Sequence, residues 1–223
     1  MNMRSLLLAV TGLLPACGLK NTILRLLGWR IGRGVSIGPC LIAGVDAAEI
    51  GDNAKIGPFN VFRNLVRLEV GDGALMGQWN WITGARIILD AGAPGVFHLG
   101  RETAFTSRHY VDCTGGLYLG AFSSIGGERS TFISHSADWS TAEQTWRPIR
   151  IGEYCLLSSN VQVTPGTVVG DRIIVGMGAT LSGRMEEPGL YLQPRATLVK
   201  RDLEGQYFSR DSGSMTTVRA QSG

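Results

Sequence analysis

Pairs of an aliphatic residue and a glycine recur along the chain, often six residues apart. The pairs begin at Ile31, Ile37, Ile50, Ile56, Val70, Met76, Leu99, Leu119, Ile125, Ile151, Val169 and Val175. A small or β-branched residue stands four positions after many of these aliphatic residues, as Ala54 does after Ile50. From Ile151 to Leu181 the period of six holds without interruption. The 3.6-residue period of an α-helix does not produce a strict six, and the two-residue alternation of a simple strand does not require the glycines.

The period of six predicts a stack of three-sided coils. Each aliphatic residue would lie inside one edge of a coil, and the small residue would pack inside the same corner. We expect glycine after the aliphatic residue because it tolerates the backbone conformation of a tight corner. Stacked coils bury a continuous aliphatic core, as in other solenoid proteins. The fold predicted from the repeat is therefore an all-β parallel solenoid.

Two breaks interrupt this regularity and mark candidate sites. Coils begin near residues 31, 50, 70, 99, 119, 151 and 169, and the intervals 70–99 and 119–151 are longer than the rest. The first excess falls in residues 85–97, where Ala91–Gly95 has the composition of a turn. The second falls in residues 134–148, which begin near His135 and are rich in polar and aromatic residues. Insertions on a rigid scaffold often carry function, so we expect an active site at 134–148.

Composition narrows the class of protein. The chain has 223 residues, 31 glycines, 17% charged residues and a formal net charge of +3. That charge is too small to predict nucleic-acid binding, and the hydrophobic content argues against disorder. The four cysteines and three histidines are scattered without the spacing of metal ligands, so we expect no metal.

The repeat and two further segments resemble the hexapeptide-repeat acyltransferases, over residues 31–201. One segment is Phe132–His135 followed by Arg147–Gly152; the other is Ser107–Gly116, which resembles the glycan O-acetyltransferase subgroup. The resemblance implies a left-handed parallel β-helix, although right-handed crossovers are the general rule. It also implies acetyl-CoA as co-substrate and a homotrimer with active sites between subunits.

By this resemblance, His135 is the general base, since an imidazole titrates near neutral pH. Either Asp138 or Asp112 would orient its ring, with Asp138 given the catalytic role. Gln144 and Arg147, in the same loop, are expected to contact the substrate.

Two other groups are expected at the acceptor site. Arg108, His109 and Asp112 would line it, unless they form an ordinary polar strand. Trp79 and Trp81 flank Asn80, and this trio could stack on a sugar ring or pack against a neighbouring subunit.

The coenzyme is expected along the C-terminal coils. The resemblance implies contacts from Ser159, Met177 and Gly178 to the pantetheine arm. Basic residues beyond the last coil would meet the phosphates, and they are Arg184, Lys200 and Arg201. The sequence departs from the family pattern at Leu156–Ser158 and at Ser182–Gly183.

The ends of the chain suggest a three-part organisation. Residues 1–30 form an amphipathic segment that caps the core, rests on a membrane surface, or does both. Residues 31–201 form the β-helix, and residues 202–223 a partly disordered tail. The cysteine usage favours a reducing compartment, so we expect a cytoplasmic protein, peripheral to the inner face of the membrane if the N-terminal segment binds lipid.

The function expected from these features is acetyl-CoA-dependent O-acetylation of a sugar hydroxyl in a polysaccharide, glycolipid or glycan precursor. Two alternatives stay open: N-acetylation of an amino sugar, and a non-catalytic β-solenoid that serves binding or assembly. A zinc hydratase of the same fold needs three histidine ligands. The spacing of His98, His109 and His135 does not match that family.

Overall fold

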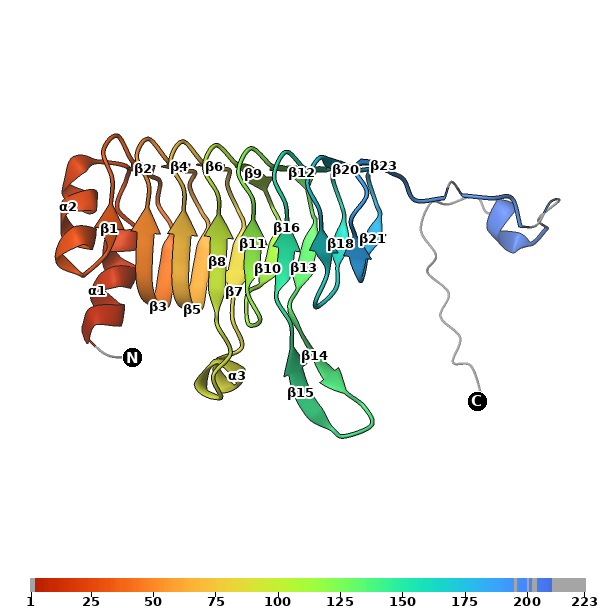
Figure 1. Ribbon diagram of the computed structural model, residues 1–223, viewed down its shortest axis with the longest axis horizontal. Coiled ribbons are helices and arrows are strands. Elements are labelled where there is room, and N and C mark those ends of the chain that lie inside the picture. The colour runs from red at the N-terminus through yellow and green to blue at the C-terminus, as the bar shows by residue number, and fades with distance from the viewer. Residues whose placement is uncertain (1–2, 195, 200, 202–203, 210–223) are drawn as a thin grey trace. The chain divides into compact units, whose positions relative to one another are not determined.

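The computed structural model describes residues 3–194, 196–199, 201 and 204–209. The chain divides into two units, residues 1–193 and 194–223. The first unit is a parallel β-helix preceded by two helices, seen in Figure 1. Among the described residues of the second unit, the 3-10 helix η1 (Gln206–Phe208) is the regular element.

Three strand faces build each coil of the first unit, and parallel pairing joins equivalent strands of successive coils. The first face leads to the candidate site. Its strands are β3 (Leu41–Ile50), β5 (Val61–Val70), β7 (Trp81–Thr83), β10 (Tyr110–Asp112), β13 (Thr131–Ile133), β18 (Gln162–Val163) and β21 (Thr180–Leu181).

Strands β3 and β5 are long enough to turn a corner and also contribute to the second face. The other strands of that face are β1 (Arg30–Ile31), β8 (Val96–Leu99), β11 (Leu117–Leu119), β16 (Ile149–Ile151), β19 (Val168–Val169) and β22 (Arg184–Met185).

The third face is a separate parallel sheet. Its strands are β2 (Ser36–Ile37), β4 (Lys55–Ile56), β6 (Leu75–Met76), β9 (Ala104–Ser107), β12 (Ser124–Glu128), β17 (Leu156–Leu157), β20 (Ile173–Val175) and β23 (Gly189–Tyr191).

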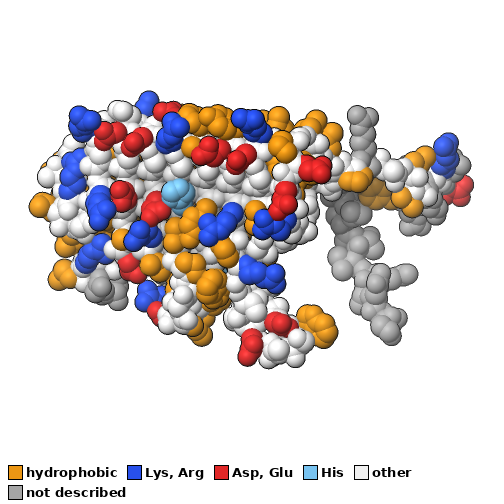
Figure 2. Space-filling model, viewed as in Figure 1, with side chains coloured by type: hydrophobic (Ala, Val, Ile, Leu, Met, Phe, Trp, Pro, Cys, Tyr) orange, Lys and Arg blue, Asp and Glu red, His pale blue; other side chains and the backbone are white. Residues whose placement is uncertain are grey.

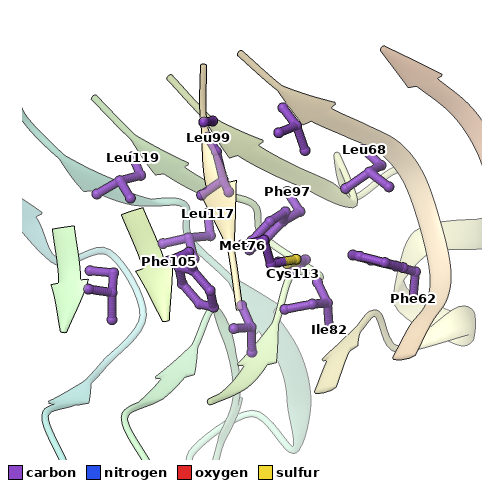
Figure 3. Packing of buried hydrophobic residues seen from close by; sticks show 14 of the residues in the cluster. Phe62, Leu68, Met76, Ile82, Phe97, Leu99, Phe105, Cys113, Leu117 and Leu119 are labelled. Carbon is purple, nitrogen blue, oxygen red and sulfur yellow. The ribbon is translucent and has the colours of Figure 1, made fainter. Parts of the chain in front are cut away.

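The core lies between the three faces and contains the aliphatic residues of the repeat. Ile151, Leu157, Val163, Val169 and Val175 are all buried, and so are the small or β-branched residues four positions later. Figure 3 shows part of this core, where Phe97 and Phe105 meet edge to face at 5.5 Å between ring centroids. The predicted all-β solenoid is therefore confirmed.

The reason expected for the glycines is wrong. The glycine of each aliphatic-glycine pair has no left-handed backbone conformation; positive φ angles occur elsewhere in the turns, for example at Asn53. The pair glycines are needed because successive coils approach closely. A Cβ atom on Gly51 would lie 2.5 Å from the backbone nitrogen of Asp72, and one on Gly57 would lie 2.6 Å from the carbonyl oxygen of Gly77.

One interior corner of the first face contains a ladder of polar side chains. Asn60 Oδ1 accepts the backbone N–H of Asn80 at 2.8 Å, and Asn80 Oδ1 accepts that of His109 at 2.9 Å. His109 Nδ1 accepts the N–H of Ser130 at 3.1 Å, and the Ser130 hydroxyl accepts that of Val161 at 3.1 Å. Each side chain thus satisfies a backbone donor of the next coil, which would be costly to leave unpaired inside the core.

Helices α1 (Met3–Gly12) and α2 (Gly18–Leu26) lie at the N-terminal end of the β-helix. Leu8 and Leu24 are fully buried members of the core cluster. The Lys20 side chain is also buried, and its Nζ donates to the carbonyl oxygens of Gly12, Leu14 and Gly38 at 2.7–3.0 Å. This segment therefore caps the core. Among the described residues, no helix combines the length and apolar character needed to cross a membrane.

Both breaks of the repeat form excursions, which project from the same side of the solenoid in Figure 1. Between β7 and β8 the chain forms α3 (Arg86–Asp90), with its own small buried cluster of Ile88, Leu89 and Ala93. Between β13 and β16 it forms an antiparallel hairpin, β14 (His135–Asp138) paired with β15 (Glu143–Trp146). The second expected loop is thus a regular hairpin, and His135 is its first residue.

Candidate active site

The candidate site is built around a histidine and a buried carboxylate. Asp112 ends β10 and is 3% exposed, and its strand pairs with β13, which leads into the hairpin. His135 Nδ1 lies 2.7 Å from Asp112 Oδ2, and the His135 side chain is 31% exposed. The ring therefore has one nitrogen fixed by the protein while part of its surface faces solvent.

Several further donors hold the Asp112 carboxylate. Oδ2 accepts the backbone N–H groups of Ser134 and His135 at 2.9 and 3.0 Å, and Oδ1 accepts the hydroxyl and N–H of Thr114. Burial acts to raise the pKa of Asp112. The hydrogen bonds from Thr114, His135 and Ser134 outweigh burial, so the pKa lies below its usual value. Asp112 is therefore ionised at neutral pH.

An ionised Asp112 determines the tautomer of His135. A carboxylate can only accept, so Nδ1 carries the proton and Nε2 of the neutral ring keeps a free lone pair. A carboxylate in this position also stabilises the imidazolium that forms when Nε2 takes up a proton. The pair is thus arranged to act as a general base toward a group that approaches Nε2.

Thr114 connects this pair to the α3 excursion. Its hydroxyl donates to Asp112 Oδ1 and accepts the N–H of Ala85 at 2.8 Å. Its carbonyl oxygen accepts the N–H of Gly95 at 3.1 Å. Ala85 and Gly95 stand at the two ends of the excursion, so both ends are attached to the residue that orients Asp112.

Gly115 supports the base of the hairpin. Its N–H donates to the Ser134 hydroxyl at 2.8 Å, and Arg147 N–H donates to the Ser134 carbonyl oxygen at 2.9 Å. A Cβ atom on Gly115 would lie 2.5 Å from that carbonyl oxygen and 2.8 Å from the one of Arg147. Sequence reasoning gave no role to Thr114, Gly115 or Ser134, although all three lie in the segments that carried the resemblance.

Of the two carboxylates expected as alternatives, Asp138, which was given the catalytic role, does not orient His135. Asp138 pairs with Glu143 toward the tip of the hairpin and accepts the N–H and hydroxyl of Ser140 at 2.8 and 2.6 Å. The hairpin extends away from the coil, so its fourth residue cannot return to the ring. Asp112, the other carboxylate expected to orient the ring, takes this position.

The expectation that His109 lines the acceptor site is wrong. It is 1% exposed and belongs to the interior ladder, with Nε2 3.0 Å from the Thr106 hydroxyl. Burial lowers the pKa of His109 to about 4, so the ring is neutral at physiological pH. Arg108, the preceding residue, is exposed and pairs with Glu128 at 3.1 Å.

The expected aromatic platform is divided. Asn80 is fully buried in the ladder and donates to the Thr106 carbonyl oxygen at 2.8 Å, so it cannot contact a sugar. Trp79 stacks on Phe59, with ring centroids 4.6 Å apart. Trp81 is 47% exposed on β7, beside Tyr110 of β10. Trp81 is thus the member of this trio that lies on the strand face leading to Asp112.

Gln144 and Arg147 lie at different distances from the base of the hairpin. Gln144 is exposed on β15 and pairs with Ala137, away from His135. Arg147 follows β15, is exposed, and packs its aliphatic part near Gly166. Arg147 is therefore close to the His135 end of the hairpin, on the side of the C-terminal coils.

The residues expected to contact the coenzyme differ in exposure and in their partners within the protein. Met177 is 70% exposed, and the Gly178 N–H donates to the Ser159 carbonyl oxygen at 3.0 Å. Arg184 pairs with Glu186 at 2.7 Å. Arg201 is exposed in the second unit, and Lys200 lies outside the described residues.

The second face has a different character. Figure 2 shows basic and acidic side chains interspersed over it, without a large field of one sign. Glu69 contacts both Arg67 at 3.0 Å and His98 at 2.8 Å, and Arg150 lies over the Tyr118 ring at 4.5 Å. In the described part of the chain, no cluster of three or more His, Cys, Asp or Glu side chains could hold a metal ion.

No protein-family model and no curated protein matches the sequence. Similar solved structures include the polysialic acid O-acetyltransferase OatWY, at 13% identity over 77% of this chain and 89% of that chain, with a TM-score of 0.49. AntD, an N-acyltransferase from Bacillus cereus crystallised with dTDP and coenzyme A, is 13% identical over 80% and 88% of the two chains, with a TM-score of 0.43.

The UDP-N-acetylglucosamine O-acyltransferase LpxA from Moraxella catarrhalis is 16% identical over 68% of this chain and 55% of that chain, with a TM-score of 0.37. At these identities and TM-scores, the comparisons assign no activity to this chain.

Proposed function

We propose that this protein is an acyltransferase that moves the acetyl group of acetyl-CoA to a hydroxyl group of a sugar unit. The observation that carries the proposal is the 2.7 Å contact between His135 Nδ1 and the buried Asp112 carboxylate, at the base of a projecting hairpin. The sequence resemblance to hexapeptide-repeat acyltransferases supplies the reaction class.

In the proposed reaction His135 Nε2 takes the proton of the acceptor hydroxyl. The acceptor oxygen attacks the thioester carbonyl carbon and forms the new ester bond, while the carbon–sulfur bond breaks. The proton then passes from His135 to the thiolate sulfur, so that coenzyme A leaves as a thiol. A positioned general base contributes about a hundredfold to ten-thousandfold in rate. Asp112 would assist by stabilising the charged ring during the transfer.

The coenzyme would lie on the C-terminal side of His135. The exposed side chains of Met177 and Arg147, together with the surface near Ser159, could receive the pantetheine arm. Arg184 and Arg201, with Lys200 beyond the described residues, would meet the phosphates. The Gly178 N–H already donates within the protein, so the main contribution of Gly178 would be the absence of a side chain.

A homotrimer belongs to this proposal. Both excursions end in strongly exposed apolar side chains, Trp139 at 92% and Ile87 at 79% exposure, and burial against a neighbouring subunit would remove them from water. Light scattering at micromolar concentration should give three times the chain mass. A monomer mass would contradict this part of the proposal.

A cytoplasmic location and contact with the inner face of a membrane are also part of the proposal. Leu6, Leu7 and Val10 are exposed on α1 and could enter a lipid surface. Lys20 and Arg25 donate to backbone carbonyl oxygens, so any such contact would depend on apolar side chains more than on charge. Cosedimentation with lipid vesicles, for wild type and Val10→Asp, would test it. The buried cysteines Cys40, Cys113 and Cys155 are free thiols, which fits a reducing compartment.

The test is a transfer assay with acetyl-CoA and a panel of sugars, amino sugars and oligosaccharides. Thiol release and product mass are followed together, and the position of the acetyl group is determined by NMR. Acetylation of a hydroxyl supports the proposal. Acetylation of an amine alone would establish the N-acetyltransferase alternative. Absence of both transfer and coenzyme binding would leave a non-catalytic β-solenoid and overturn the proposal.

A further inference from the structure

A groove of about 500 Å³ lies beside the candidate active site, on the strand face that carries Asp112. Its floor includes Trp81 of β7 and Tyr110 of β10, which are partners in the parallel register. Arg63 of β5, the register partner of Thr83, and Arg86 of α3 also line it. A volume of this size is typical of small-ligand sites.

The groove lies over the strands that lead to Asp112, the residue that holds His135. Tyr110 and Asp112 are two residues apart on β10, so their side chains extend from the same side of the strand. Thr83, which also lines the groove, is the register partner of Asp112 on the next strand. Neighbouring strands lie about 4.8 Å apart, so the groove begins within one strand spacing of the carboxylate that holds His135.

The chemistry of the lining favours an acidic carbohydrate. Trp81 and Tyr110 are 47% and 45% exposed and present aromatic surface to the apolar side of a sugar ring. Arg63 has no carboxylate within ion-pair distance among the described residues, and Arg86 is held by Asp90 at 2.8 Å. The lining includes two guanidinium groups and no carboxylate, and guanidinium groups bind carboxylates and phosphates in forked geometry.

A second groove provides a contrast. It has a volume of about 400 Å³ and lies on the second face, where Glu49, Glu69 and Asp72 line it together with Arg101. Three carboxylates there would repel an acidic sugar. The groove beside β7 and β10 is therefore the one suited to an anionic ligand.

We propose that the groove at Trp81, Tyr110, Arg63 and Arg86 binds an acidic sugar unit of an oligosaccharide acceptor, next along the chain to the unit that reacts at His135. This inference rests on the proposed function, because His135 defines the reacting end. The groove extends away from His135 over β7 to β5, so one ring cannot occupy it and also present a hydroxyl to the base. The acceptor is then an oligomer that carries carboxylate or phosphate groups.

The test is binding without acetyl-CoA to an array of acidic and neutral oligosaccharides, followed by titration of the acidic oligosaccharide that binds best. We expect acidic oligosaccharides to bind and neutral ones of equal length to bind at least about tenfold more weakly. Trp81→Ala should weaken binding of the acidic oligosaccharide about fivefold or more. Arg63→Gln should remove most of the preference for acidic over neutral oligosaccharides. Trp79→Ala is the matched control, since Trp79 is exposed but does not line the groove.

The thermal unfolding of each variant is measured first, so that a loss of fold is not taken for a loss of binding. Absence of any acidic ligand on the array would overturn the inference, and so would equal binding by wild type and Trp81→Ala. Ligand binding that depends on Trp81, without acetyl transfer to any acceptor, would uphold the groove and contradict the proposed function. Acetyl transfer that is unchanged in Trp81→Ala would support the proposed function and contradict the role of the groove.

Discussion

Gly115 lies against the carbonyl oxygen of Ser134 so closely that a Cβ atom on Gly115 would stand 2.5 Å from it. The same Cβ atom would stand 2.8 Å from the carbonyl oxygen of Arg147, which ends the other side of the hairpin. The missing side chain at Gly115 thus sets the position of the hairpin base, and with it the position of His135.

Gly115→Ala should therefore displace the hairpin base. Both obstructing atoms belong to the backbone, so the strain would be relieved by movement of Ser134 and His135. We expect a loss of about 1–3 kcal/mol in unfolding free energy from overpacking, and a fall in kcat of about tenfold or more from misplacement of the base. Gly189→Ala is the control, since a Cβ atom at Gly189 meets nothing within 4 Å. Equal kcat for both variants would show that the hairpin base tolerates the shift.

Asp112→Asn should reduce kcat by about a hundredfold to ten-thousandfold. The amide keeps the shape of the side chain but not its charge, so it neither enforces the Nδ1–H tautomer nor stabilises the imidazolium. Asp138→Asn is matched in chemistry and should leave kcat within about twofold of wild type, because Asp138 hydrogen-bonds Ser140 within the hairpin. Steady-state kinetics measures both. A larger fall in kcat for Asp138→Asn than for Asp112→Asn would show that Asp138 orients His135.

His109 should make the stability of the fold depend on pH. Its pKa is about 4 in the folded protein and 6.5 in the unfolded chain, so between these values the unfolded chain binds more protons. The contribution of His109 to the unfolding free energy is then fully present above pH 6.5. It is lost as the pH falls toward 4, which lowers the unfolding free energy by roughly 3 kcal/mol at most.

His109→Asn tests this prediction, since Asn60 and Asn80 occupy the same ladder with an amide. Urea unfolding at several pH values should show a smaller decline for the variant than for wild type below pH 6.5. Parallel declines would mean that His109 does not titrate as described.

Lys20→Met should destabilise the N-terminal cap. Lys20 Nζ supplies donors to three backbone carbonyl oxygens in a buried environment, and burial lowers the pKa of its ammonium group. Without these donors, the carbonyl oxygens of Leu14 and Gly38 would lose the Lys20 hydrogen bond, and that of Gly12 would keep only the backbone N–H of Cys40, at 2.7 Å. We expect a loss of about 3 kcal/mol or more in unfolding free energy. The exposed Lys55→Met should change it by less than about 0.5 kcal/mol; a similar loss in both variants would contradict the capping role.

The fold was predictable because it depends on a short period. Every aliphatic residue from Ile151 to Leu181 in the six-residue series is buried, and both breaks of the period are excursions. The same pattern also carries a signal for the interior polar ladder. Asn80 and His109 stand four positions after Met76 and Phe105, where the repeat places its interior residues. The tryptophans that flank Asn80 and the motif around His109 favour a surface position for both residues instead, and that prediction is wrong.

The rest of the site depends on contacts between coils. Thr114 reaches Ala85, and Asp112 reaches His135, across separations of more than twenty residues. A repeat gives the order of the coils but not which outward side chains face each other after an excursion. The sequence alone therefore leaves the choice between Asp112 and Asp138 open, and the register of β10 with β13 decides it. The role of Gly115 depended on the same register.

The central claim is that His135, held by Asp112, is the general base of an acetyl transfer. The most direct measurement is thiol release from acetyl-CoA with an acceptor found in the panel, for wild type, His135→Ala and His98→Ala. His98 is a second partly exposed histidine bound to a carboxylate, so its variant controls for loss of a surface imidazole. We expect turnover to fall about a hundredfold or more in a folded His135→Ala protein, and to stay at the wild-type level in His98→Ala. Undiminished turnover in His135→Ala would contradict this role of His135.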